Sequence, residues 1–108
     1  MSAALQYLQS WFQAQCDGFW EHGSGITIQT LDKGGWMVTI DVAGTPLEAR
    51  LMTPVRRERN EKDWIVCSVE YGKFQGEGDL AKLGEILEVF AAWAASCKRT
   101  GSGTSATA

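Results

Sequence analysis

The chain has 108 residues, which is enough for one domain and too few for two. Its hydrophobic content of 44% and charged content of 21% are typical of a soluble globular protein, and no apolar run approaches the roughly 18 residues of a membrane span. The net charge is −3 and is uneven: residues 1–49 and 63–97 each carry −4, whereas residues 50–62 carry +3, so most of the domain would repel a polyanion.

The first part of the chain predicts a helix followed by a β-hairpin. Apolar residues at helical spacing predict a helix over Ala3–Cys16, and Gly18 is placed to end it in a left-handed cap. The runs ITIQTL (26–31) and WMVTIDV (36–42) alternate in polarity and are joined by a glycine-containing loop, which predicts a hairpin. One face of its second strand carries Trp36, Val38, Ile40 and Val42.

The middle of the chain, residues 43–63, has a weaker pattern. LEARLM (47–52) is consistent with a short strand or a sheet edge, and VRRERNEKD (55–63) is too charged to lie in a core. Gly44 and Pro46 would interrupt any strand before these segments. The sequence therefore leaves the connection between the two hairpins open.

The last part predicts a second hairpin and a helix. WIVCSVE (64–70) and a short strand around Lys73–Gln75 flank a tight turn at Tyr71–Gly72. GEGD is predicted as a loop in which Asp79 caps an amphipathic helix over Leu80–Cys97. The small, uncharged residues that follow predict a domain over 1–99 and a disordered tail over 100–108.

This order predicts the α+β class: a single domain with an antiparallel sheet of about four strands and an N-terminal and a C-terminal helix packed on it. One face of the sheet would bury both helices, over Trp36, Ile40, Trp64 and Val66 or their alternates. The other face would be partly open and would carry Thr39, Asp41 and Glu70.

Residues 16–22, CDGFWEH, collect the side chains that could carry chemistry. Cys16 and His22 could form a thiolate–imidazole pair, but Cys16 continues an apolar stripe into the core, and the end of a helix raises the pKa of a thiol. Asp17 and Glu21 would add metal-ligand types, yet the other cysteines have no local partner ligands. We therefore expect no catalysis, no metal and no cofactor.

Two further features leave alternatives open. Trp20 lies in a loop between acids, where an indole either closes the end of the sheet or stands exposed as a binding anchor. The segment Arg50–Arg59 could contact phosphate, as in an RNA-binding module. The odd number of cysteines, none in a CxxC pair, and the lack of a signal peptide favour reduced thiols and a cytoplasmic location.

A set of short motifs resembles the immunity-protein family numbered 53 of bacterial polymorphic toxin systems. The resemblance runs from about Leu5 to Trp93. Its motifs are Cys16-Asp17-Gly18-x-Trp20-Glu21-His22, Gly25-Ile26, Leu31-Asp32-x-x-Gly35-Trp36, Asp41, Gly44-Thr45-x-Leu47, Glu58-Arg59, Asp63-Trp64, Lys73-Phe74-x-Gly76-x-Gly78-Asp79, Glu85-Ile86-Leu87 and Phe90-x-x-Trp93.

This resemblance implies a small cytosolic α+β protein that binds and blocks a toxin encoded beside it. The expected partner is a cognate toxin domain that is basic, with a nuclease as one candidate; no membrane partner and no direct contact with nucleic acid are expected. An acidic, aromatic surface suits such a partner because carboxylates steer association with a basic protein. The expected contact residues are Asp17, Trp20, Glu21 and His22, with Asp41 and Asp63 as neighbours.

Two other functions remain as alternatives: a small cysteine-dependent enzyme that uses Cys16 and His22, and an RNA-binding module that uses Arg50–Arg59. A structural reading of the Trp20–Glu21 pair also remains, in which the indole closes the core and Glu21 accepts hydrogen bonds from loop N–H groups.

Overall fold

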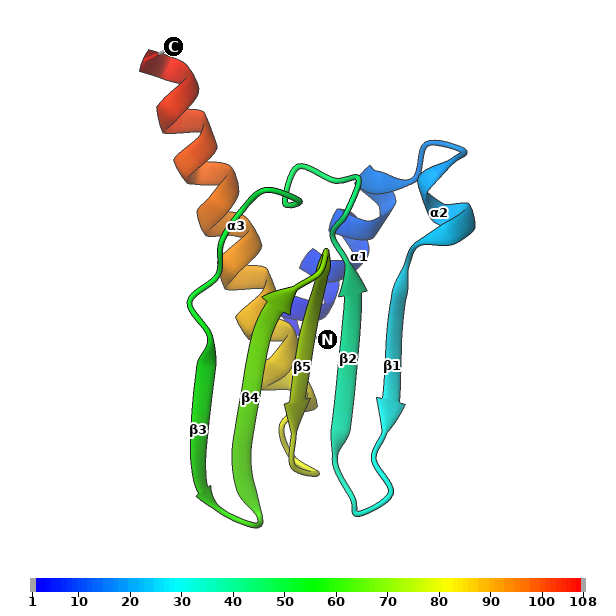
Figure 1. The fold of residues 1–108 in the computed structure, drawn as a ribbon, viewed down its shortest axis with the longest axis vertical. Coiled ribbons are helices and arrows are strands. Elements are labelled where there is room, and N and C mark those ends of the chain that lie inside the picture. The colour runs from blue at the N-terminus through cyan, green and yellow to red at the C-terminus, as the bar shows by residue number, and fades with distance from the viewer. Residues whose placement is uncertain (1, 108) are drawn as a thin grey trace.

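A computed structural model describes residues 2–107, with side chains described over residues 2–97 (Figure 1). It confirms the predicted α+β class and single domain, but the antiparallel sheet has five strands instead of about four. The predicted disordered tail, residues 100–108, lies outside the residues with described side chains and stays a prediction. The elements are α1 (Ala3–Gln15), α2 (Trp20–Gly23), β1 (Ile26–Thr30), β2 (Trp36–Asp41), β3 (Val55–Asn60), β4 (Asp63–Glu70), β5 (Lys73–Gly78) and α3 (Leu83–Thr107).

The strands follow the order β1-β2-β5-β4-β3, and every neighbouring pair is antiparallel. Figure 1 shows α1 and α3 on one face of the sheet, while the other face is uncovered. The register places Asp41, Lys73 and Glu70 side by side at one end of the sheet, where α2 also lies. We call this the α2 end, and we call the opposite end, where α3 begins, the α3 end.

The strand missed by sequence reasoning is β3, whose residues VRRERN form one edge of the sheet. LEARLM, considered as a strand or an edge, instead forms turns and irregular chain. A charged segment can still be a strand at an edge, because it pairs on one side only and its charges discourage pairing with other chains. As the sequence predicts, the charged segment 55–63 lies outside the core: Val55 and Asp63 are partly buried and its other residues are exposed.

The core lies between the sheet and the two long helices. Val38, Ile40, Ile65 and Phe74 are fully buried on the sheet, and Phe90 meets them from α3. Trp36 and Ile40 lie on the helix-covered face of the sheet, as expected. Strand β4 instead places the alternate set of its residues on that face, because Ile65 pairs with Gly78. Trp64 and Val66 therefore belong to the open face, together with Thr39, Asp41 and Glu70 as predicted.

Gly76 and Gly78 lie inside β5, not in the loop that the sequence predicts, and they let α3 approach the strand closely. A Cβ atom on Gly76 would lie 2.4 Å from the Cγ2 atom of Ile86, and one on Gly78 would lie 2.5 Å from the Cβ atom of Lys82. No side chain fits at these distances, so the two glycines determine how near the helix can pack to the sheet.

Both long helices differ from their predicted bounds, and α3 differs at both ends, since it extends to Thr107 and not to the predicted end at Cys97. Helix α3 begins at Leu83, not at Leu80, whose side chain is largely exposed in the turn before it. Helix α1 ends at Gln15, and Cys16 follows it in an extended conformation, so Gly18 does not form the predicted cap. This early end turns Cys16 to the surface and not into the core, where it was expected.

Candidate functional site

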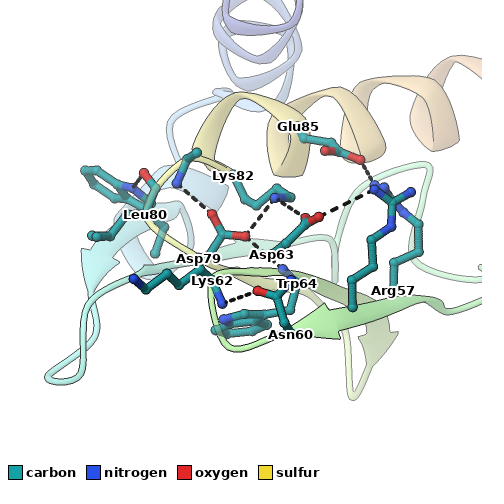
Figure 2. Close-up of polar contacts among 12 residues, drawn as sticks. Arg57, Asn60, Lys62, Asp63, Trp64, Asp79, Leu80, Lys82 and Glu85 are labelled. Atoms are coloured by element: carbon teal, nitrogen blue, oxygen red, sulfur yellow. Dashed lines mark hydrogen bonds and ion pairs between the residues drawn. The ribbon is translucent and has the colours of Figure 1, made fainter.

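At the α3 end, a polar cluster joins three elements around Asp79 (Figure 2). The Asp79 side chain is buried; its Oδ1 atom accepts a hydrogen bond from the Ala81 N–H (2.8 Å), and its Oδ2 atom accepts from the Trp64 N–H (2.8 Å). The Lys82 ammonium group donates to the same Oδ2 atom (2.7 Å) and to Asp63 (2.8 Å). These bonds connect the start of β4, the end of β5 and the turn that leads into α3.

The charge state of Asp79 follows from these contacts. The hydrogen bond from Lys82, supported by the N–H groups of Ala81 and Trp64, lowers the pKa of Asp79 to about 2 against the opposing effect of desolvation. The two carboxylates in turn raise the pKa of Lys82. A lysine held between two acids at a helix start is an ion pair that stabilises the fold, and its ammonium group is already occupied.

The arginines of β3 are also paired with acids. Arg56 pairs with Glu58, and Arg57 pairs with Glu85 on α3, as Figure 2 shows for the second pair. Arg59 lies 3.4 Å from Asp63. The basic segment is therefore largely neutralised by intramolecular contacts, and Asp63 lies at the opposite end of the sheet from the other predicted contact residues.

At the α2 end, the residues after α1 form a turn held by two carboxylates. Both oxygens of Glu21 accept backbone N–H groups, from Asp17 at 2.9 Å and from Gly18 at 2.8 Å. Asp17 in turn accepts from the N–H groups of Phe19 (2.9 Å) and Trp20 (3.0 Å), and these bonds to Trp20 and Phe19 lower its pKa. The carboxylates thus shape the turn and remain at the surface.

Trp20 connects this turn to the rest of the domain. Its indole N–H donates to the carbonyl oxygen of Ala43 (3.0 Å), and its ring lies edge-on to Trp11 with the centroids 6.0 Å apart. Phe12 contacts the same ring at 5.8 Å, and Gly44 lies against it. The half-buried indole closes the gap between α1 and the segment after β2, as in the structural reading of this residue.

Asp41 links the exit of α2 to the sheet. Its carboxylate accepts the Gly25 N–H (2.8 Å) and pairs with Lys73 on the neighbouring strand. The structure therefore brings Asp17, Trp20, Glu21, His22 and Asp41 to one end of the molecule and leaves Asp63 apart. Whether the first five contact a partner stays a prediction.

Cys16 and His22 were weighed as a catalytic pair. The thiol of Cys16 donates to the Phe12 carbonyl oxygen at 3.4 Å, and desolvation, followed by the charges of Glu21 and Asp17, raises the pKa of Cys16. A thiol held in its neutral form is a weak nucleophile. These contacts do not favour a thiolate–imidazole pair.

Sequence reasoning missed two exposed aromatic side chains at the α2 end. Phe19 is 87% exposed in the turn before α2, and Tyr71 is 98% exposed in the turn between β4 and β5. The acids on both sides of Trp20 favoured the indole as the binding residue, although the ring of the adjacent Phe19 is more accessible. No sequence pattern distinguished Tyr71 from an ordinary turn residue.

The described residues also bear on metal clusters, membrane spans and grooves. In the part of the chain that the structure describes, no group of three or more His, Cys, Asp or Glu residues is arranged to hold a metal ion. None of the described helices has both the length and the hydropathy of a membrane span. A groove of about 730 Å³ runs between α3 and residues 49–53, and its walls include Leu51, Met52 and Trp93.

Comparisons with known proteins give one match. Residues 5–95 match the family model described as immunity protein 53. The matched segment covers most of the chain. Searches of curated proteins and of solved structures give no match.

The structural role of Trp20 can be tested against its exposed neighbour. Trp20→Ala should lower the free energy of unfolding by about 2 kcal/mol, because it removes the aromatic packing and the bond to Ala43. Phe19→Ala should change it by no more than about 0.5 kcal/mol, since that ring has few contacts. Urea unfolding of both variants checks this, and equal effects would contradict the assigned structure of the turn.

Asp79 should make the protein sensitive to acid. Its pKa of about 2 is below the ordinary 3.8, so its charged form stabilises the folded state above pH 4, and this contribution is lost as the pH falls from about 4 to 2. Asp79→Asn should therefore be less stable than the wild type at neutral pH, and the difference should shrink across that range. Thermal melts from pH 7 to pH 2 measure it; a difference independent of pH would refute the assignment.

Proposed function

Since this chain belongs to the immunity protein 53 family, we propose that it binds and neutralises a cognate bacterial toxin by stoichiometric protein–protein contact. The family match over residues 5–95 is the observation that carries the proposal. We further propose that the toxin belongs to a polymorphic toxin system and that the immunity protein acts in the cytoplasm, where such a toxin would otherwise damage its own producer.

The α2 end is the proposed contact surface. Asp17, Glu21 and His22 lie together there, and both carboxylates hold the turn, with Asp17 exposed and Glu21 half-buried. Trp20 supports the surface from below, and Asp41 fixes the chain where α2 meets the sheet. Such a rigid, acidic surface supports contact with a basic toxin, including a nuclease, because preorganised charges steer association. Asp63 is left out of this set because it lies at the α3 end.

The intramolecular contacts of Cys16 and of the β3 arginines make the two alternative functions, catalysis and RNA binding, less favoured. Catalysis through Cys16 would need an activated thiolate, whereas its pKa is raised. RNA binding through the basic segment would need free guanidinium groups, whereas Arg56, Arg57 and Arg59 each pair with a carboxylate.

Stoichiometric binding predicts inhibition that saturates when one chain is present per toxin molecule. The toxin domain encoded beside this gene would be titrated with the wild-type chain and with Cys16→Ala, and residual toxin activity would be measured. Both chains should inhibit equally, because a binding mechanism does not use the thiol. Complete inhibition by a small fraction of an equivalent would instead indicate an enzyme, and loss of inhibition in a folded Cys16→Ala chain would implicate the thiol.

The carboxylates at the α2 end should mainly affect how fast the toxin binds. The double variant Asp17→Asn with Glu21→Gln removes two charges. It retains the single Asp17 oxygen that accepts hydrogen bonds and one of the two Glu21 oxygens that do so. Its association rate should fall about threefold to tenfold in low salt, because electrostatic steering weakens. The matched control is Glu88→Gln, a neutralised exposed acid on α3.

Stopped-flow binding and a thermal melt of each variant measure the outcome. If the double variant stays folded and associates as fast as the control, the toxin contact lies elsewhere. If it unfolds, the two carboxylates act only through the hydrogen bonds of the turn.

A further inference from the structure

Tyr71 occupies an unfavourable backbone position without any contact that explains it. Tyr71 and Gly72 have φ angles of 54° and 75°, and among the described residues Tyr71 is the one non-glycine residue with positive φ. A two-residue hairpin turn with two positive φ angles strongly favours Asn-Gly or Asp-Gly. The Tyr71 side chain is 98% exposed, so packing within the chain does not offset the strain.

A second exposed ring, that of Phe19, is held at the same end of the molecule. The Ala43 N–H donates to the Gly72 carbonyl oxygen (3.1 Å), while the Ala43 carbonyl oxygen accepts the indole N–H of Trp20 (3.0 Å). One residue thus connects the turn that carries Tyr71 with the helix that follows Phe19. The close fit of Gly72 against Ala43 further restricts this arrangement, and Figure 1 shows both turns at the α2 end.

The charges around these rings are mainly negative. Glu70 precedes Tyr71, Asp17 and Glu21 flank Phe19, and Glu48 accepts the N–H of Gly44 beside Trp20. The Lys73 cation at this end is paired with Asp41. Among the described residues these acids have no ion-pair partner, although several accept backbone N–H groups. Exposed aromatic faces beside such carboxylates fit a surface of Arg and Lys side chains, whose charge attracts both carboxylates and rings and whose apolar stems pack on rings.

We propose that Tyr71 and Phe19 are the apolar anchors of the toxin contact and that the complementary toxin surface carries Arg or Lys side chains. This inference rests on the proposed function and adds two residues to the contact surface. In this arrangement the half-buried Trp20 supports the contact surface, and the exposed rings bind the toxin, as expected for large aromatic side chains at interface centres.

The test uses a change that the fold should accept. Tyr71→Asn places a residue suited to the turn, so the melting temperature should stay the same or rise, whereas the affinity for the toxin domain should fall at least about 30-fold. Phe19→Ala should weaken binding in the same direction. The control Leu51→Asn removes an apolar side chain that is 93% exposed beside the groove on α3, and it should leave the affinity unchanged.

The probe is the toxin domain encoded beside this gene, inactivated by substitution, and the measurements are calorimetric titration and a thermal melt. If folded Tyr71→Asn binds within threefold of the wild type, the inference fails while the proposed function stands. If Leu51→Asn weakens binding and Tyr71→Asn does not, the contact lies at the groove. If the wild-type chain does not bind the toxin, the proposed function fails and the inference fails with it. Association that is insensitive to salt would overturn the basic character of the toxin surface.

Discussion

The close approach of helix α3 to strand β5 is the constraint on which the rest of the structure depends. At Gly76 and Gly78 the helix lies so near the strand that a Cβ atom would overlap Ile86 or Lys82. Packing at this distance buries Ile86 and Phe90 against Phe74, and α1 then fits beside α3. It also brings Lys82 between Asp79 and Asp63, so the apolar contact and the ion pairs depend on the same two glycines.

The two ends of the sheet use their charges differently. At the α3 end, Asp79, Asp63 and Lys82 satisfy one another, and the arginines of β3 are paired along the adjacent edge. At the α2 end, Asp17 and Glu21 hold a turn without an ion-pair partner among the described residues, and Asp17 is exposed while Glu21 is half-buried. Paired charges are poor contacts for a partner because they must first be separated, whereas exposed carboxylates beside aromatic rings are suited to binding. This difference supports the proposal that the α2 end is the surface for recognition.

Rigidity at the α2 end comes from backbone hydrogen bonds to side chains instead of from deep burial. Glu21, Asp17 and Trp20 all bind backbone groups, and Ala43 connects α2 with the turn between β4 and β5. Because these hydrogen bonds restrain the loops before binding, such a surface is expected to lose little conformational entropy on binding. The same hydrogen bonds would allow one short motif to combine its structural role with the proposed binding role.

The sequence by itself determined the fold class, the two hairpins and both long helices, because hydrophobic periodicity is a local property of the chain. It also identified the 16–22 segment and, through its resemblance, the family that the comparison confirms. The tertiary structure alone decided that 55–60 is an edge strand, which face of β4 is buried and that Gly76 and Gly78 are packing positions. These features depend on strand register and on distances between segments remote in sequence. For the same reason, only the folded chain shows that Trp20 is held inside a turn while Phe19 and Tyr71 remain exposed beside it.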